Sequence, residues 1–292
     1  MNDIKKLEIE SIDKLLLSHL LTTEPFPPQL HIHNNAYELT MFKSGNVDYF
    51  INNITYHLTP GDLLLICPND IHGLSVKDHE PCERFPIHFN EAFIQTFSTP
   101  NTNILTCFQN HERNHILHLS EDQMRQYEYL VTQTIEALNR KEFGYDIYAK
   151  ANLSLILLLA NQASVTKPAR LADITPQAVR DAIQYVDQNL SNTLSIQDIA
   201  DHLNLSRSRF CHLFKDFTGT SPWNYIIARR IQHACTLLQK GMSITDVCFE
   251  CGFNDYAHFV KSFTKLVGIS PGKYSKTLPG NTDTSESSHA YF

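Results

Sequence analysis

The sequence predicts an α+β protein, in which an antiparallel β-barrel and two helices are followed by an all-α module with two helix–turn–helix units. Three observations predict this arrangement. Residues 30 to about 90 contain short segments of alternating polar and apolar residues. After about residue 120 the apolar residues recur at helical spacing. Near the C-terminus, one stretch of the chain is repeated 48 to 49 residues later.

The predicted strands lie between residues 30 and 90. Residues 31–33, 47–51 and 56–58 alternate in polarity, as strands with one buried face do. Residues 63–67 form a short continuous apolar run, which is typical of a strand buried on both faces. Glycine, proline and asparagine residues separate these segments. Several short strands at this spacing predict a small antiparallel barrel.

Two helices are predicted after the barrel. Ser120 and Gln123 have the spacing of a capping box ahead of a helix over residues 124–140. Residues 147–163 predict a second helix that is apolar over much of its circumference, so it must pack on more than one side. Its additional contact is either the core of the barrel or a dimer interface, and both alternatives are open at this point.

These patterns divide the chain into two domains. The expected segments are a first domain at 1–163, a linker at 164–174, a second domain at 175–278 and a disordered tail at 279–292. Thr175 and Pro176 are expected to open the second domain, as the N-cap and first helical residue of a helix that ends near Asn189.

Charge is distributed unevenly between the two halves. Residues 1–167 carry a net charge of −8 and residues 168–278 a net charge of +3, within an overall −7. The basic surplus therefore lies in the half with the repeats, where it permits contact with phosphates. Seven irregularly spaced cysteines argue against a disulfide framework. Without a signal-peptide pattern or a membrane-spanning run, we expect a cytoplasmic protein with no membrane contact.

The repeat reads as helix, tight turn and helix in each copy. The first copy covers residues 194–225 and the second covers residues 242–274, and each ends in Ser-Pro-x-x-Tyr. Ser206 and Asn254 are residue types that cap a helix at the start of the second helix of each copy. A single helix over residues 223–240 is expected between the copies, which would hold the two second helices about 34 Å apart, one turn of DNA.

The same residues resemble a known family. Arg229-Arg230, Gly252-Phe253 and Ser270-Pro271-x-x-Tyr274, with the apolar residues between them, are similar to the signature of AraC-type transcription regulators. The resemblance implies a seven-helix module whose two second helices enter successive major grooves of double-stranded DNA. Matched onto this chain, the DNA-binding residues would be Ser208, Arg209, Cys211 and His212 in the first unit and Tyr256, Ala257, Val260 and Lys261 in the second. Helical spacing places Arg207, Lys215 and Lys265 outside the buried faces of the same helices, so they are further DNA-binding candidates.

The N-terminal half resembles a second pattern. His31-x-His33-x4-Glu38-x6-Gly45 has the spacing of the first cupin motif, and residues 61–72, ending in His72, approximate the second. In metal-dependent cupins the corresponding residues converge on iron, manganese or zinc, and His31, His33, Glu38 and His72 are a chemically adequate ligand set. The second motif departs from the enzyme pattern, because Asp70 occupies the region of an expected glycine and Gly73 follows His72.

Three alternatives are therefore open for these polar residues: a small-molecule pocket, a metal site, or hydrogen-bonded polar groups of the core. A ligand pocket is favoured, and polar groups inside a small barrel suit a polyhydroxylated ligand. Arg84, followed at period two by Pro86 and His88, is the basic candidate for the same pocket.

Together these observations predict a homodimeric transcription regulator, not an enzyme, with a cupin-like sensor domain that binds a small molecule, most simply a carbohydrate, and requires no cofactor. Activation of carbon-source genes and contact with RNA polymerase are expected by analogy with the family. The competing hypotheses are a metal-dependent cupin enzyme fused to a DNA-binding module and a regulator whose cupin domain only dimerises.

Overall fold

The computed structural model describes residues 4–12, 15–26, 30–33, 36–109, 115–166 and 175–278. The expected tail at 279–292 lies outside the described residues. So does most of the expected linker, and the first three residues of that segment instead continue the preceding helix to Thr166.

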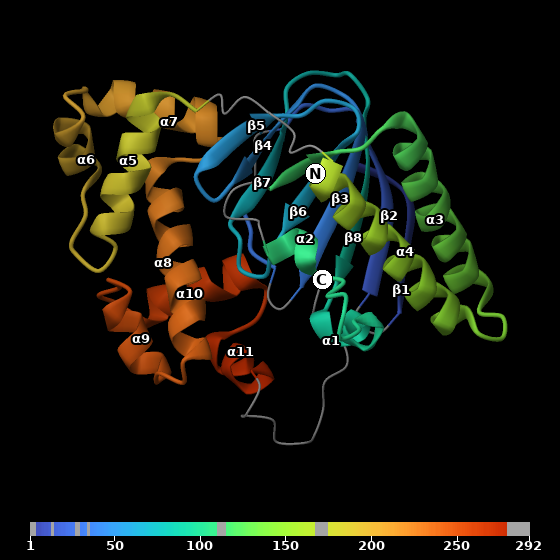
Figure 1. Ribbon diagram of the computed structural model, residues 1–292. Helices are drawn as coiled ribbons and strands as arrows, with labels where there is room; N and C mark the ends of the chain where they lie inside the picture. The colour runs from blue at the N-terminus through green and yellow to red at the C-terminus, as the bar shows by residue number, and fades with distance from the viewer. Residues whose placement is uncertain are drawn as a thin grey trace.

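The N-terminal half is an antiparallel β-structure of two sheets (Figure 1). The larger sheet has the strand order β1-β2-β8-β3-β6-β9, and the smaller has the order β5-β4-β7. The bounds are β1 Ile4–Ile12, β2 Leu15–Thr22, β3 Tyr37–Ser44, β4 Val47–Ile51, β5 Ile54–His57, β6 Asp62–Ile66, β7 His72–Val76, β8 Cys82–Phe89 and β9 Ile116–His118.

The predicted strands are confirmed with one exception. The segments at 47–51, 56–58 and 63–67 correspond to β4, β5 and β6 within two residues. Residues 31–33 do not form a strand, because pairing in this segment is limited to an isolated bridge between His31 and His72. Every residue of β6 is buried, as the continuous apolar run predicted.

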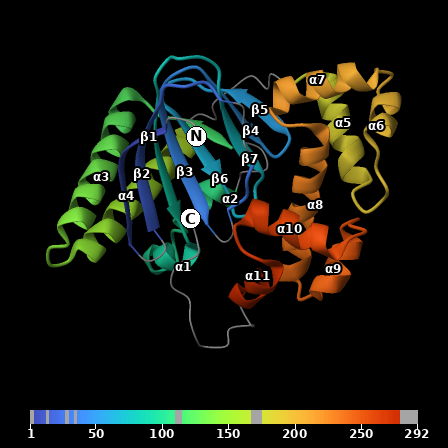
Figure 2. The same ribbon diagram turned by 180° about the vertical axis from the view of Figure 1, so that it is seen from behind.

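Helices cover the outer face of the larger sheet. The capping box of Ser120 and Gln123 is present at the start of α3 (Glu121–Arg140). This helix and α4 (Tyr145–Thr166) lie side by side over the sheet in Figures 1 and 2. Short helices α1 (Glu91–Ile94), η1 (Gln95–Phe97) and α2 (Thr106–Gln109) connect β8 to β9. One face of α4 therefore packs on the sheet of its own chain.

The C-terminal half contains seven helices in its described residues, the number that the family resemblance implied. They are α5 Gln177–Gln188, α6 Ile196–His202, α7 Arg207–Thr218, α8 Pro222–Gln239, α9 Ile244–Glu250, α10 Tyr256–Val267 and α11 Pro271–Thr277. The long central helix α8 lies between α5–α7 and α9–α11 (Figure 1). The predicted helix over residues 223–240 is confirmed, and its buried side includes Ile231 and Ala234, which are fully inaccessible.

Two predicted helix caps are wrong. The N-cap of α10 is Asp255, whose side chain accepts from the backbone N–H groups of Ala257 and His258, so Asn254 lies outside the helix. The offset of 49 residues between the second helices of the repeat aligns Ser206 with Asp255. Thr175 is not the N-cap of α5, which is Pro176; the Thr175 hydroxyl instead accepts a 3.0 Å hydrogen bond from the backbone of Thr55 in the β-domain.

The layers follow one order across the molecule. Helices α3 and α4 pack on the larger sheet, the two sheets enclose a second core, and the C-terminal helices lie beside the smaller sheet (Figures 1 and 2). Over the described residues, every helix is too short or too polar to cross a membrane.

Candidate functional site

The second helix of the first repeat presents a polar face. Ser206 caps α7 by accepting from the backbone of Arg209, while Phe210 and Phe214 turn into the core. The remaining predicted residues lie outward: Arg207, Ser208, Arg209, His212 and Lys215 are exposed and Cys211 is half-buried. This face thus carries three full positive charges and a histidine, which are donors suited to base edges and phosphates.

The second repeat presents a less basic face. On α10, Phe259 and Phe263 are buried, while Tyr256, Ala257, Lys261 and Lys265 are exposed. Val260 is half-buried and packs partly against the core of the module. Lys261 and Lys265 are therefore the two cations of this face.

Arg230 joins the turn that precedes the first repeat to the second repeat. Its Nε donates to the Leu190 carbonyl at 3.0 Å and its Nη2 to the Asn192 carbonyl at 2.8 Å, and both acceptors belong to the turn after α5. The guanidinium also lies over the ring of Phe253, at 5.9 Å from the centroid. Since Phe253 opens the turn before α10, Arg230 sets the position of that helix relative to the first repeat.

The other candidate site lies between the two sheets, where side chains of β3, β7 and β8 meet. Glu38 on β3 lies opposite His88 on β8 in the strand register. The Oε2 atom of Glu38 lies 3.0 Å from Nε2 of His33 and 3.3 Å from Nε2 of both His72 and His88. Its Oε1 accepts a 2.6 Å hydrogen bond from the Thr40 hydroxyl. One buried carboxylate is thus surrounded by three imidazoles. We use the name histidine cluster for Glu38 together with His31, His33, His72 and His88.

His31 completes the cluster at its rim. Its ring centroid lies 4.2 Å from that of His72 and 4.9 Å from that of His33, and the side chain is exposed. The His72 ring is fully buried and contacts the backbone carbonyl of Asp70 through Nδ1 at 2.8 Å. The cluster is therefore closed at His72 and reaches solvent at His31.

Burial and hydrogen bonding act on the pKa values of this cluster in opposite directions. Burial alone would raise the pKa of Glu38, but the charge of His88 and hydrogen bonds from the surrounding imidazoles hold it well below its usual range. Burial lowers the pKa of His33 to about 4, although its hydrogen bond with Glu38 acts in the opposite sense. Burial would also lower the pKa of His72, yet contact with Glu38 raises it. At neutral pH the site therefore combines a carboxylate with a neutral imidazole at His33.

Arg84 is not brought into the cluster. It pairs with Phe42 in the register, four residues along β3 from Glu38, and its Nη1 donates to the Thr22 hydroxyl at 2.9 Å. The ring of Tyr49 stacks on that of His72, with 6.2 Å between centroids. Burial raises the pKa of Tyr49, the charge of Glu38 raises it further and the charge of Arg84 lowers it. Sequence reasoning placed His88 on the correct face but gave it no role, because its contact with Glu38 depends on the pairing of β3 with β8.

The donor set also fits a metal ion. Ligand atoms of His31, His33, Glu38 and His72 all lie within 4.8 Å of one another. Imidazole and carboxylate ligands at such separations suit zinc, iron or manganese. These residues would hold the ion if one binds, and its chemical contribution would be positive charge next to the Glu38 carboxylate.

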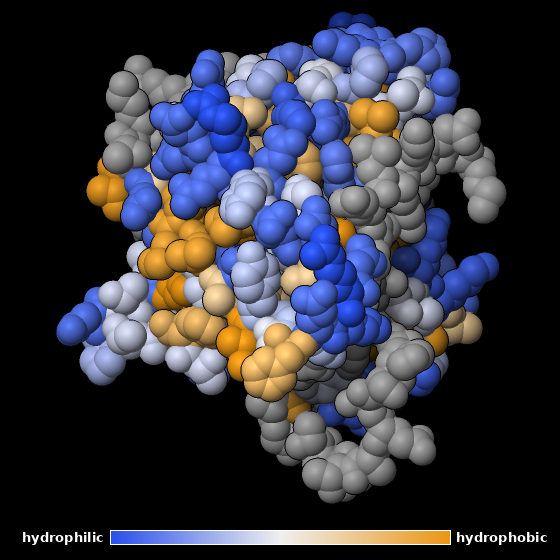
Figure 3. Space-filling view, turned by 90° about the vertical axis from the view of Figure 1, so that its right-hand side faces the viewer, coloured by the Kyte–Doolittle hydropathy of each residue, from blue (hydrophilic) through white to orange (hydrophobic). Residues whose placement is uncertain are grey.

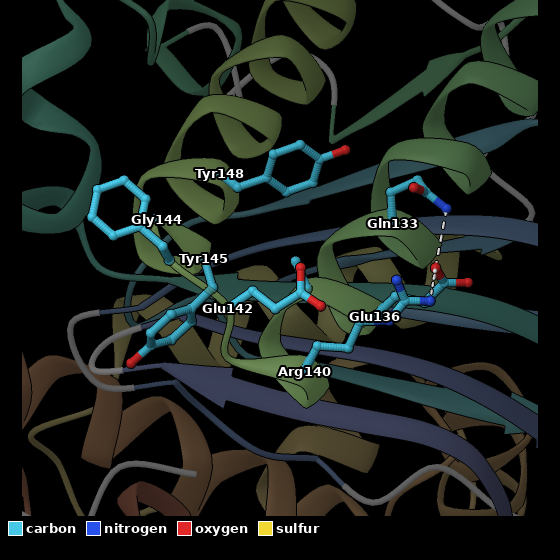
Figure 4. Close-up of a pocket in the computed structure, with 9 residues that line it drawn as sticks. Gln133, Glu136, Arg140, Glu142, Gly144, Tyr145 and Tyr148 are labelled. Carbon is cyan, nitrogen blue, oxygen red and sulfur yellow. Dashed lines mark hydrogen bonds and ion pairs between the residues drawn. The ribbon is translucent and has the colours of Figure 1, made fainter.

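A separate hollow of about 250 Å³ lies where α3 turns into α4 (Figure 4). Its lining includes Glu136, Arg140, Glu142 and the rings of Tyr145 and Tyr148. None of its lining residues belongs to the histidine cluster or to the outward faces of α7 and α10. The hollow adjoins the exposed side of α4, not the space between the two sheets.

Comparison with known proteins matches both halves of the chain. Residues 21–157 match the AraC-like ligand binding domain, and residues 199–277 match a helix-turn-helix domain. The melibiose operon regulatory protein of Escherichia coli is 26% identical over 277 residues, which are 87% of each chain. The arabinose operon regulatory protein of Salmonella typhimurium is 31% identical over 220 residues, which are 74% of each chain.

Among solved structures, ToxT from Vibrio cholerae aligns with a TM-score of 0.38 at 15% identity, covering 91% of this chain and 99% of its own. The relatives named above are regulators of operons and not enzymes. From the two domain matches and these relatives, it follows that the chain belongs to the AraC family of DNA-binding transcription regulators.

Proposed function

We propose that this regulator is a cytoplasmic homodimer that activates genes for sugar utilisation when a carbohydrate binds the histidine cluster. The observation that carries the proposal is the convergence of Glu38 with His33, His72 and His88 inside the sensor domain. Sugar hydroxyls need paired donors and acceptors, which a carboxylate and its surrounding imidazoles supply. The sugar effector is supported by the names of three relatives, which refer to the melibiose, arabinose and lactose operons. Activation is supported by the name of the third, the lactose operon transcription activator of Staphylococcus xylosus.

On the DNA side, α7 and α10 are proposed to enter two adjacent major grooves. Arg209, His212 and Lys261 have the reach and the donors for base edges or phosphates. The exposure of these three side chains supports the proposal, as does the rigid spacing that α8 imposes. RNA polymerase is a further proposed partner of the DNA-bound regulator. The sensor domain is assigned to residues 1–163 and the DNA-binding module to residues 175–278.

The proposed dimer forms through α4. Ile147, Leu155, Leu158 and Val165 are 68%, 46%, 40% and 85% exposed, although the opposite side of the same helix is buried. They recur along one side of the helix, and Figure 3 shows apolar side chains gathered on the face of the molecule that carries α3 and α4. The exposed side of α4 would be covered by α4 of a second copy of the chain, which offers the same apolar residues.

A thermal-shift screen of the full chain against a panel of mono- and oligosaccharides tests the effector. A true effector at about one hundred times its Kd is expected to stabilise the protein by about 2.7 kcal/mol. The effect should disappear in Glu38→Gln and persist in Glu80→Gln, an exposed carboxylate of the same domain. Stabilisation that survives Glu38→Gln would place the sugar elsewhere.

A divalent metal is the second candidate effector, favoured by the spacing of the ligand atoms. Metal content measured on the same sample separates the candidates. Stoichiometric zinc, iron or manganese that is lost in His72→Ala, with no response to any sugar, would establish a metal sensor. A metal-free protein that responds to a sugar would exclude it.

A further inference from the structure

Two segments of the sensor domain have one face on the histidine cluster and the other on the DNA-binding module. In residues 31–33, the two histidines belong to the cluster, while Ile32 between them is 3% exposed and packs in the apolar core of the C-terminal helices. In the second segment, His72 contacts Glu38 and its neighbour Ile71 is fully buried in that same core. Successive side chains of extended backbone point to opposite sides. Residues 31–33 and 69–72 therefore separate the cluster from the module by the thickness of a single backbone, and we call these two segments the wall.

The wall is hydrogen-bonded within itself. His31 and His72 exchange backbone hydrogen bonds of 3.0 and 3.2 Å, and the Asn69 N–H donates to the His33 carbonyl at 3.0 Å. A displacement of one histidine backbone therefore moves the other segment of the wall.

The DNA-binding module binds this wall through α8. The Gln232 amide donates to the Asn69 carbonyl at 2.9 Å and to the Asn52 side-chain oxygen at 3.2 Å. The Tyr225 hydroxyl donates to the Asn52 carbonyl at 3.2 Å, and its ring packs near Phe50 of β4. The acceptors for α8 are therefore backbone and turn groups of the wall and of the adjoining β4–β5 turn.

Asn52 and Asp70 join those acceptors to the cluster. The Asn52 amide donates to the Asp70 carboxylate at 2.9 Å, and its oxygen accepts from the Ile71 N–H at 3.1 Å. The backbone carbonyl of Asp70 contacts His72 Nδ1 at 2.8 Å. One residue thus connects the imidazole of His72 to the side chain that receives Gln232.

We infer that residues 31–33 and 69–72 are the coupling element of this regulator, through which a change at the histidine cluster alters the docking of α8 on the sensor domain. The inference rests on the proposed function, in which the effector binds that cluster. Coupling of this kind is reciprocal. A change in the docking of α8 must therefore alter the affinity of the cluster for its effector by the same factor by which the effector alters the docking equilibrium.

A double-mutant cycle in the full chain tests the coupling without any effector. The variants are Glu38→Gln, at the cluster, and Gln232→Ala, on α8. Trp223 is the single tryptophan of the chain and lies on α8, so its fluorescence during urea denaturation follows the DNA-binding module. We expect the two changes to be non-additive, by about fivefold in the unfolding equilibrium constant, the lower end for coupled sites.

The matched control cycle combines Glu38→Gln with Asn224→Ala, an exposed amide on the same helix, and should be additive. Additivity of Glu38→Gln with Gln232→Ala, or equal non-additivity in the control cycle, would overturn the inference. If no sugar stabilises the protein, the proposed effector is wrong, but the result of the double-mutant cycle is unaffected. If the cycle is additive, the proposed coupling route is wrong, but the proposal that a sugar binds the cluster is unaffected.

Discussion

Replacing Arg230 by methionine tests how the turn after α5 is held against the second repeat. The substitution removes two hydrogen bonds from a charged donor, at 3.0 and 2.8 Å, to the carbonyl groups of Leu190 and Asn192. Each such bond contributes about 1.5–3 kcal/mol, and part of the loss is offset because the guanidinium of Arg230, a residue that is 5% exposed, is no longer desolvated. We expect the free energy of unfolding of the module to fall by about 3 kcal/mol.

Urea denaturation followed by Trp223 fluorescence measures this change, and Arg229→Met is the matched control. Arg229 pairs with Asp187 at 2.8 Å, but the two side chains are 20% and 33% exposed. Water screens such a pair, so its removal should cost about 0.5–1 kcal/mol. Equal losses in the two variants would refute the argument that the carbonyl contacts of Arg230 hold the turn after α5 against the second repeat.

Three further predictions concern other parts of the molecule. Arg209→Ala should weaken binding to a duplex selected from a random pool by about 1–3 kcal/mol. Fluorescence anisotropy measures it, and an equal loss in Arg140→Ala, on the sensor domain, would remove α7 from the interface. Leu155→Glu places a charge on the exposed apolar side of α4 and should convert a dimer to a monomer in sedimentation velocity; a variant that stays dimeric excludes this face. Gly252→Ala should destabilise the module by about 1–3 kcal/mol, because φ is +78° and the new Cβ would lie 2.6 Å from the Leu190 carbonyl oxygen. An unchanged denaturation midpoint would contradict it.

The helices in both halves of the chain were predictable from local signals. Ser206 caps α7, the capping box of Ser120 opens α3, and apolar stripes at helical spacing mark the buried side of each helix. The cap of α10 was misplaced by one residue, because Asn254 and Asp255 are both capping types and one inserted residue separates the repeats. Thr175 was misassigned for a different reason: its hydroxyl bonds to Thr55, 120 residues away in the sequence.

The sensor site shows what local patterns leave undetermined. Alternation placed His31 and His33 on one face, but that segment has a single bridge partner and is not a strand. It could not place His88 beside Glu38 or Arg84 opposite Phe42, because both pairings depend on the antiparallel register of β3 with β8. A strand's side-chain period is a property of its own backbone, whereas its register is a property of two strands.

The sequence by itself therefore determined the two domain types, the repeated helices and the outward faces of α7 and α10. Each of these is indicated by the spacing of particular residue types along the chain. Only the tertiary structure decided which imidazoles surround Glu38. It also decided that Ile32 and Ile71, which are adjacent in sequence to histidines of the cluster, point the opposite way and pack against the DNA-binding module. The physical reason is that hydrogen bonds between strands and packing between domains join residues that no local period relates.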